Sequence, residues 1–87
     1  MSDLKKHFEQ ASSDVKKLKK DPGNERKLKL YALYKQATEG DVKGQRPGLL
    51  DFVGGAKHDA WAEVKGMKPE EAMKKYVSLV ERLKERG

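Results

Sequence analysis

The sequence predicts an all-α fold made of four helices. Apolar residues recur at helical steps of three and four in four separate stretches, and no stretch alternates with the period of two that a half-buried β-strand needs. Prolines and glycines lie between these stretches, where they end one helix and precede the next. A chain of 87 residues is too short for two independent cores, so residues 1–87 are assigned to a single domain.

The first helix is predicted over residues 3–19. Its apolar stripe consists of Leu4, Phe8, Ala11, Val15 and Leu18. Pro22 disfavours helical backbone at the residue before it, so the chain is expected to turn there. Asn24 is then expected to cap a second helix over residues 25–39, which ends at Gly40.

The second helix is predicted to have two useful faces. The apolar one is made of Leu30, Leu33 and Ala37. The adjoining one carries Tyr31, Tyr34 and Lys35 at the i, i+3 and i+4 positions, which lie together on a helix. Two aromatic rings beside a lysine suit a stacked base next to a phosphate. Two core tyrosines with a solvated lysine would give the same pattern, and the residues alone leave both interpretations open.

Residues 40–50 contain three glycines and a proline without helical periodicity, and they form a long connection for so small a domain. Such a length is typical of an overhand crossing between helices or of a functional loop. A third helix is predicted over residues 52–65. Its apolar positions are Phe52, Ala56, Ala60 and Val64, with Trp61 beside them as a core residue. Gly54 and Gly55 do not belong to a phosphate-binding GxxxxGK[ST] loop, so they indicate close packing at the helix entry.

The fourth helix is predicted over residues 69–85. Pro69 suits the first helical position, and Glu70 and Glu71 follow at the positive end of the helix dipole. One stripe consists of Ala72, Tyr76, Leu79 and Leu83, and Met73, Val77 and Val80 lie beside it.

Composition narrows the classes of function. The 20 Lys and Arg exceed the 14 Asp and Glu by six, which favours an anionic partner without saying which one. The chain has no cysteine, and His7 and His58 are not in a metal-ligand cluster, so no catalytic residue, metal site or cofactor is expected. The first ten residues are charged throughout and lack the apolar core of a signal peptide, so a cytoplasmic location is expected.

Two segments of the sequence resemble the acyl-CoA-binding protein family. Residues 31–41, YALYKQATEGD, are similar to its YxxYKQATxGD signature, and residues 46–52, RPGLLDF, are similar to its RPGxxDF segment. Shorter matches follow at the family's spacing: Ala56-Lys57, Asp59-Ala60-Trp61, Lys65-Gly66 and Ala72-Met73-Lys74-Lys75-Tyr76. Several motifs in one order, over most of the chain from Phe8 to Lys84, make the resemblance specific.

The resemblance implies an up-down-down-up four-helix bundle with an overhand connection at residues 40–51 between the second and third helices. It also implies a single acyl-CoA-binding domain that carries long-chain fatty acyl-CoA esters, acts as a monomer and serves acyl-CoA-using enzymes. The implied ligand-binding residues are Lys16, Tyr31, Tyr34, Lys35, Lys57 and Tyr76. Among them, Tyr31, Lys35 and Lys57 would hold the ribose 3′-phosphate, and Tyr34 would stack on adenine. The acyl chain would lie near Phe8, Val15 and Leu28.

The sequence departs from the family pattern at a few positions. His58 stands where members usually have tryptophan, and Val53 and Gly55 stand where many have lysine. Lys27 replaces an apolar residue, and Lys68 occupies the usual Ser or Thr cap of the fourth helix. These changes bear on affinity and chain-length preference rather than on ligand class.

An alternative hypothesis is a basic binding module for an anionic membrane surface or nucleic acid, which the net charge alone supports. The pattern of charges speaks against this alternative, because the lysines of the chain alternate with acidic residues and no block of five or more like charges occurs. No nucleic-acid partner is therefore expected, and contact with membranes is expected to be transient at most.

Overall fold

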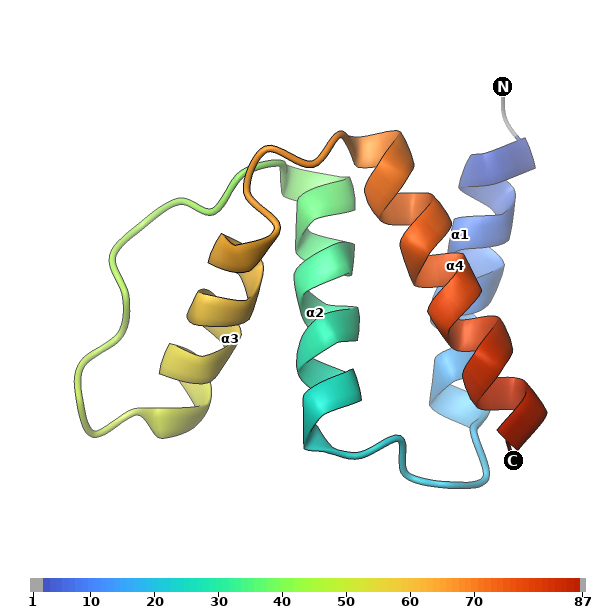
Figure 1. Cartoon of the computed structure of the whole chain (residues 1–87), viewed down its shortest axis with the longest axis horizontal. Helices are drawn as coiled ribbons and strands as arrows, with labels where there is room; N and C mark the ends of the chain where they lie inside the picture. The colour runs from blue at the N-terminus through green and yellow to red at the C-terminus, as the bar shows by residue number, and fades with distance from the viewer. Residues whose placement is uncertain (1–2, 87) are drawn as a thin grey trace.

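The computed structural model describes residues 3–86 and is helical with connecting loops (Figure 1). The four α-helices are α1 (Asp3–Asp14), α2 (Asn24–Glu39), α3 (Phe52–Glu63) and α4 (Pro69–Arg86). A single 3-10 turn, η1 (Val15–Lys17), follows α1. The all-α prediction is confirmed, while residues 1, 2 and 87 of the predicted domain lie outside the described residues.

The helices follow the up-down-down-up order that the resemblance implied. Figure 1 shows α2 and α3 running in one direction and α1 and α4 in the other. The connection over residues 40–51 starts at the end of α2 and travels the length of the bundle before α3 begins. This overhand path is what makes α2 and α3 parallel neighbours. The main packing pairs are α2 with α3, α2 with α4, and α1 with α4.

Two helix boundaries differ from the prediction because the last turn of each helix tightens. The first α-helix ends at Asp14, and the 3-10 turn η1 leads into extended backbone at Leu18 (φ −61°, ψ 135°), so the predicted end at Lys19 is wrong. Three-residue 3-10 turns are common where an α-helix ends. Helix α3 likewise stops at Glu63 rather than Lys65, and the chain reverses at Gly66 with φ of +90°.

The start of α2 corrects a second prediction. Asn24 does not cap the helix but is its first residue, and the cap position is Gly23 with φ of 92°. The Asp21 side chain accepts a hydrogen bond from the Gly23 N–H at 2.8 Å, and the Lys27 N–H donates to the Gly23 carbonyl at 3.0 Å. This turn brings the chain into the helix one residue earlier than a capping Asn24 would.

The core consists of aliphatic and aromatic side chains from all four helices and from Val64 directly after α3. Its buried members are Phe8, Ala11, Leu30, Ala32, Leu33, Ala37, Trp61, Val64, Ala72, Tyr76, Val80 and Leu83. Trp61 is a core residue as predicted, whereas Phe52 is 78% exposed and does not continue the α3 stripe into the core. Phe52 is the first residue of α3, at the end of the helix where the overhand connection arrives, so its side chain lies outside the packed interface.

A polar junction centred on the buried Gln36 holds the end of α2 against the connection between α3 and α4. The Gln36 amide donates to the Asp41 carboxylate and to a backbone carbonyl in that connection, each at 2.8 Å. Asp41 also accepts from the Gly66 N–H at 2.7 Å, and the Trp61 indole donates to the Gly40 carbonyl at 2.8 Å. The junction therefore fixes where the overhand connection leaves α2.

The other end of the overhand connection is fixed by charge and by two glycines. The Arg46 guanidinium makes two hydrogen bonds to the Asp59 carboxylate, at 2.9 and 3.0 Å. Asp51 caps α3 by accepting from the Gly54 N–H at 2.9 Å. A Cβ on Gly54 would overlap the Asp51 carboxylate, and one on Gly55 would lie 2.8 Å from an Arg46 nitrogen. The interpretation of both glycines as close-packing residues is confirmed.

The bundle is flat, since its Cα atoms span 36 × 31 × 15 Å. A bundle this thin has two broad faces that ligands can reach. Within residues 3–86, no helix combines the length and apolar character needed to cross a membrane. The same residues contain no group of three or more His, Cys, Asp or Glu placed to hold a metal ion.

Candidate functional site

Three aromatic rings from three helices meet on one face of the bundle. Phe8 of α1 and Tyr34 of α2 stack with ring centroids 5.5 Å apart and 24° between the ring planes. Tyr76 of α4 meets Phe8 edge-on at 5.1 Å and lies 6.0 Å from Tyr34. Phe8 and Tyr76 are buried, while Tyr34 is 42% exposed. The cluster thus presents one supported, solvent-facing ring, which is the geometry that a stacked base requires.

Burial keeps the Tyr76 hydroxyl protonated. Loss of solvent raises the pKa of Tyr76 above its ordinary value of 10.0, and the neighbouring Tyr34 adds to this effect. Because a phenolate is disfavoured there, Tyr76 is a hydrogen-bond donor at neutral pH.

A cation and a tyrosine form a second group, between α2 and α3. The Lys57 ammonium lies over the Tyr31 ring, 5.4 Å from the ring centroid. Lys57 is exposed and Tyr31 is half-buried, so the charge stays accessible while the ring holds it in place. An ammonium beside a phenol hydroxyl offers two kinds of donor to a phosphate.

Lys35 lies one position beyond Tyr34 and is held from two sides. Its ammonium pairs with the Glu39 carboxylate one helical turn later and lies 5.0 Å from the centroid of the Trp61 ring. The hydrogen bond to Glu39 raises the pKa of Lys35 above its ordinary 10.5, against a smaller opposing effect of burial. Lys35 is therefore charged at every physiological pH, and any anion that binds it has to compete with Glu39.

An apolar cavity of about 340 Å³ opens beside Tyr31 and Lys57. It is lined by Asn24, Lys27, Leu28, Tyr31, Phe52, Val53, Ala56 and Lys57, from the first turns of α2 and α3. Phe52 and Val53 are 78% and 67% exposed. The cavity falls within the range of about 300–1,000 Å³ typical of small-molecule sites.

The structure brings most of the expected site residues together in these two groups. Phe8, Tyr34 and Tyr76 share the aromatic cluster, and Leu28 lines the cavity beside Tyr31 and Lys57. Three expected residues are not part of either group. They are Lys16, which is exposed on η1, Val15, which is partly buried against the core, and Lys35, which pairs with Glu39 and lies over the Trp61 ring.

Sequence reasoning missed Phe52 and Val53 as the open edge of the cavity, because it placed Phe52 in the core and treated Val53 only as a missing lysine. Their exposure depends on where the overhand connection delivers the chain. The one available signal was their position directly after the RPGLLD segment, at the entry of α3. Asn24 at the cavity was also missed, whereas Lys27 was expected where the family often has an apolar residue facing the acyl chain. The Lys27 ammonium is held by the Asp21 carboxylate at 3.0 Å.

The hydrogen bonds of Asp41 in the polar junction predict that the folded state loses stability in acid. The pKa of Asp41 lies below its ordinary value of 3.8, chiefly because its carboxylate accepts a hydrogen bond from the Gln36 amide. The Gly66 N–H and the charge of Lys65 lower it further. A carboxylate whose pKa is lower in the folded state stabilises the fold at pH values above its pKa in the unfolded state. This contribution is lost as the pH falls through its pKa in the folded state. Stability should therefore hold near neutral pH and decline below about pH 4.

Urea unfolding of wild type and Asp41→Asn at a series of pH values measures this. The variant should lose stability at neutral pH and show a shallower decline in acid, while Asp3→Asn, at the exposed start of α1, should follow wild type. An Asp41→Asn profile parallel to wild type throughout would show that Asp41 contributes nothing to the acid response.

Comparisons with known proteins agree on one family. Residues 5–80 match the family described as "Acyl CoA binding protein". The chain is 50% identical over 76 residues to Acyl-CoA-binding protein homolog 1 of Caenorhabditis elegans, covering 87% of this chain and 88% of that protein. It is 57% identical over 76 residues to Enoyl-CoA delta isomerase 2 of Rattus norvegicus, covering 87% of this chain but only 19% of that protein. The chain therefore spans about a fifth of the length of that isomerase.

Solved structures agree in fold as well as in sequence. The crystal structure of Oryza sativa Acyl-CoA-Binding Protein 2 superimposes with a TM-score of 0.91 and 43% identity, covering 95% of this chain and 92% of that one. The crystal structure of ACBP from Moniliophthora perniciosa gives a TM-score of 0.89 and 42% identity, covering 99% and 83% of the two chains.

Proposed function

Since this chain belongs to the acyl-CoA-binding protein family, we propose that it binds long-chain fatty acyl-CoA esters and acts as their intracellular carrier. The observation that carries the proposal is the Lys57–Tyr31 pair at the edge of the apolar cavity. An acyl-CoA ester joins a phosphorylated nucleotide to a long apolar chain. A fixed cation directly beside an apolar cavity is complementary to both parts of such a molecule.

The head group has a defined set of donors on this face. In our proposal Tyr31, Lys35 and Lys57 hold the ribose 3′-phosphate, because a phosphate monoester carries about −1.5 to −2 charges and binds best to ammonium groups and hydroxyls. The adenine stacks on Tyr34, the exposed ring of the aromatic cluster. Tyr76 serves as a donor beneath that ring, and Lys16 approaches from η1 to a more distant phosphate.

The acyl chain is assigned to the cavity between the first turns of α2 and α3. Leu28, Phe52 and Val53 give it an apolar wall, and each buried methylene contributes about 0.8 kcal/mol before ordering costs. Phe8 and Val15 belong to α1 and η1 and are proposed to shelter the chain from the other side. Lys27 at the cavity edge adds a cation close to the acyl chain.

The proposal extends to the role of the protein in the cell. Residues 1–87 act as one acyl-CoA-binding domain and as a cytoplasmic monomer that delivers its ligand to acyl-CoA-using enzymes. We propose no chemical step for the chain itself, because a carrier must bind and release its ester intact. A piece of similar sequence makes up about a fifth of Enoyl-CoA delta isomerase 2, and we do not transfer that protein's named activity to this chain.

The experiment that tests this function compares three ligands by calorimetric titration: palmitoyl-CoA below its micelle threshold, a DNA duplex, and vesicles containing phosphatidylserine. Palmitoyl-CoA should bind tightly and saturably, and the other two weakly. Tight binding of DNA or vesicles without binding of palmitoyl-CoA would contradict the carrier function and would support a basic module that binds anionic surfaces.

A prediction about the parts of the ligand follows from the same geometry. Free CoA should bind measurably but more weakly than palmitoyl-CoA, and palmitate should hardly bind, because Tyr31, Lys35 and Lys57 all address the head group. Calorimetry with the three compounds under one buffer measures this order. Tight binding of palmitate that does not depend on CoA would contradict the assignment of these residues.

A further inference from the structure

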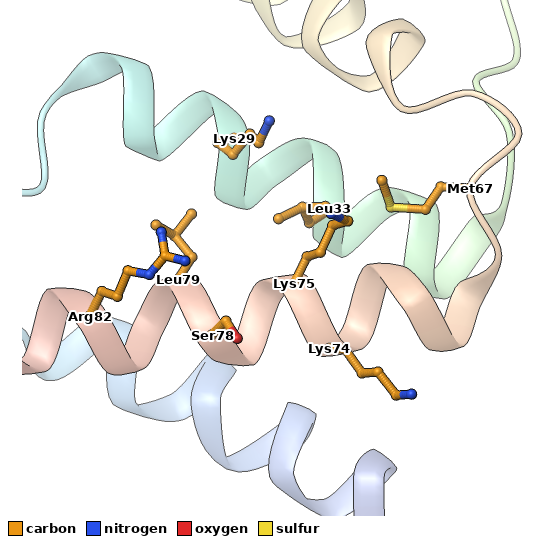
Figure 2. Close-up of a pocket in the computed structure, with 8 residues that line it drawn as sticks. All are labelled: Lys29, Leu33, Met67, Lys74, Lys75, Ser78, Leu79 and Arg82. Atoms are coloured by element: carbon orange, nitrogen blue, oxygen red, sulfur yellow. The ribbon is translucent and has the colours of Figure 1, made fainter.

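A second groove lies between α2 and α4, on the side of α2 away from Tyr31 (Figure 2). Its volume is about 420 Å³. It is lined by Lys29, Leu33, Met67, Lys74, Lys75, Ser78, Leu79 and Arg82. Leu33 and Tyr31 are two residues apart on α2, which places their side chains about 160° apart around the helix. The groove shares no lining residue with the cavity beside Lys57.

The groove has an apolar floor and a cationic rim. Leu33 is buried, and Met67 and Leu79 are half-buried, so the floor is partly open to solvent. Figure 2 shows Lys75, Leu79 and Arg82 rising from α4 toward α2, while Lys74 points away from α2. The rim consists of Lys29, Lys75 and Arg82, which are exposed, and no acidic residue lines the groove.

The rim charges are not neutralised by the ion pairs found within residues 3–86. Those pairs use Lys27, Lys35, Arg46 and Lys84 as their cations. Like charges gathered around one concave site repel one another and attract an anionic partner. The next depression along α2 has the opposite character, since Glu25, Asp59 and Glu63 line it beside Lys29. An acidic partner is thus favoured in the groove between α2 and α4 and disfavoured at this neighbouring depression.

We infer that the groove between α2 and α4 binds an acidic, amphipathic helical segment of a partner protein. Apolar side chains of that segment cover Met67 and Leu79 above the buried Leu33, and its carboxylates pair with Lys29, Lys75 and Arg82. Docking of a helix into a groove between two helices is an established mode of recognition. A flat bilayer does not reach a concave floor, and nucleic acid has no apolar group to cover it, so a protein segment fits these observations best.

The two faces can be occupied at the same time. The bundle is 15 Å thick in Cα extent, and the groove and the acyl-CoA cavity have separate linings. A partner docked in the groove therefore leaves Tyr31 and Lys57 free to hold the ligand. This inference goes beyond the carrier function and stands or falls independently of it.

The test uses the full chain and a synthetic peptide of about 15 residues, long enough to form a helix on the groove. The peptide has leucine at i, i+3, i+4 and i+7 spacing, glutamate elsewhere, and a fluorescent label for anisotropy. Lys75→Glu/Arg82→Glu reverses two rim charges, and Lys5→Glu/Lys6→Glu on α1 is the matched control with the same change in net charge. A peptide with lysine in place of glutamate tests the sign of the charge.

The acidic peptide should bind wild type and the α1 control alike, and binding should fall about tenfold or more in the groove variant. Palmitoyl-CoA affinity should be unchanged in all three proteins, and a saturating amount of it should not displace the peptide. Equal loss in both double variants, or equal binding of the lysine peptide, would overturn the inference. So would binding of phosphatidylserine vesicles that depends on Lys75 and Arg82 while the peptide does not bind, or peptide-independent dimers in sedimentation that depend on the same residues.

Discussion

Replacing Lys35 and Lys57 together by alanine is expected to weaken palmitoyl-CoA binding by about 3–6 kcal/mol, a hundredfold to ten-thousandfold loss. Each lysine is assigned one charge-assisted contact to the phosphate, and such contacts contribute about 1.5–3 kcal/mol. The two lysines come from different helices, α2 and α3, so the phosphate loses support from both sides. Calorimetric titration of wild type and variant with palmitoyl-CoA measures the difference.

The matched control is Lys29→Ala/Lys74→Ala, which removes two lysines from α2 and α4 on the opposite face. Its affinity for palmitoyl-CoA should stay close to wild type, and thermal unfolding of both double variants should show that each still folds. If the control weakens binding as much as the site variant does, the ligand senses overall charge and not this pair of lysines.

Leu33→Ala is expected to lower the free energy of unfolding by about 2–5 kcal/mol. Leu33 is 1% exposed and lies on α2, the helix that packs against both α3 and α4. A cavity at that position weakens the centre of a thin core, and the corresponding drop in Tm is roughly 10–30 °C for a domain of this size. Urea and thermal unfolding, monitored by the helical circular dichroism signal, measure both quantities.

Leu49→Ala makes the same chemical change at a side chain that is 84% exposed in the overhand connection. Its free energy of unfolding should change by less than about 0.5 kcal/mol. If the two variants were equally stable, Leu33 would not be the core residue that the structure describes.

The helices could be predicted from the sequence because their periodicity is local. The steps between Ala72, Tyr76 and Leu83 predict both the helix and its buried face, and the structure confirms both. The tightened end of α1 and the entry into α2 at Gly23 depend on backbone angles that a stripe of apolar residues does not encode. Periodicity also does not show how far a partner helix extends, which is why Phe52 was placed in the core but lies exposed.

The direction of α3 relative to α2 does not follow from local periodicity. A loop of this length is typical of an overhand crossing or of a functional loop, so the sequence itself suggested the overhand path, and the family resemblance then predicted the parallel arrangement of α2 and α3. The structure then shows the contacts that hold the connection: Gln36 with Asp41 where it leaves α2, and Arg46 with Asp59 near its middle.

The site was predicted in part. Tyr31, Tyr34 and Lys35 could be placed on one helix face from their spacing, but their roles came from the resemblance. The pairing of Lys35 with Glu39 and the support of Tyr34 by Phe8 are tertiary or rotameric details that no spacing reveals. The groove between α2 and α4 was not foreseen either, because its rim draws cations from two helices that are distant in sequence.

Titration of ¹⁵N-labelled protein with palmitoyl-CoA, followed by backbone amide chemical shifts, tests the placement of the ligand site most directly. The shift changes should saturate at equal concentrations of ligand and protein and should be largest around Tyr31, Lys35, Lys57 and Tyr76, while the groove residues stay nearly unmoved. Changes centred on Leu33, Leu79 and Arg82, or small changes spread over all lysines without saturation, would contradict this placement.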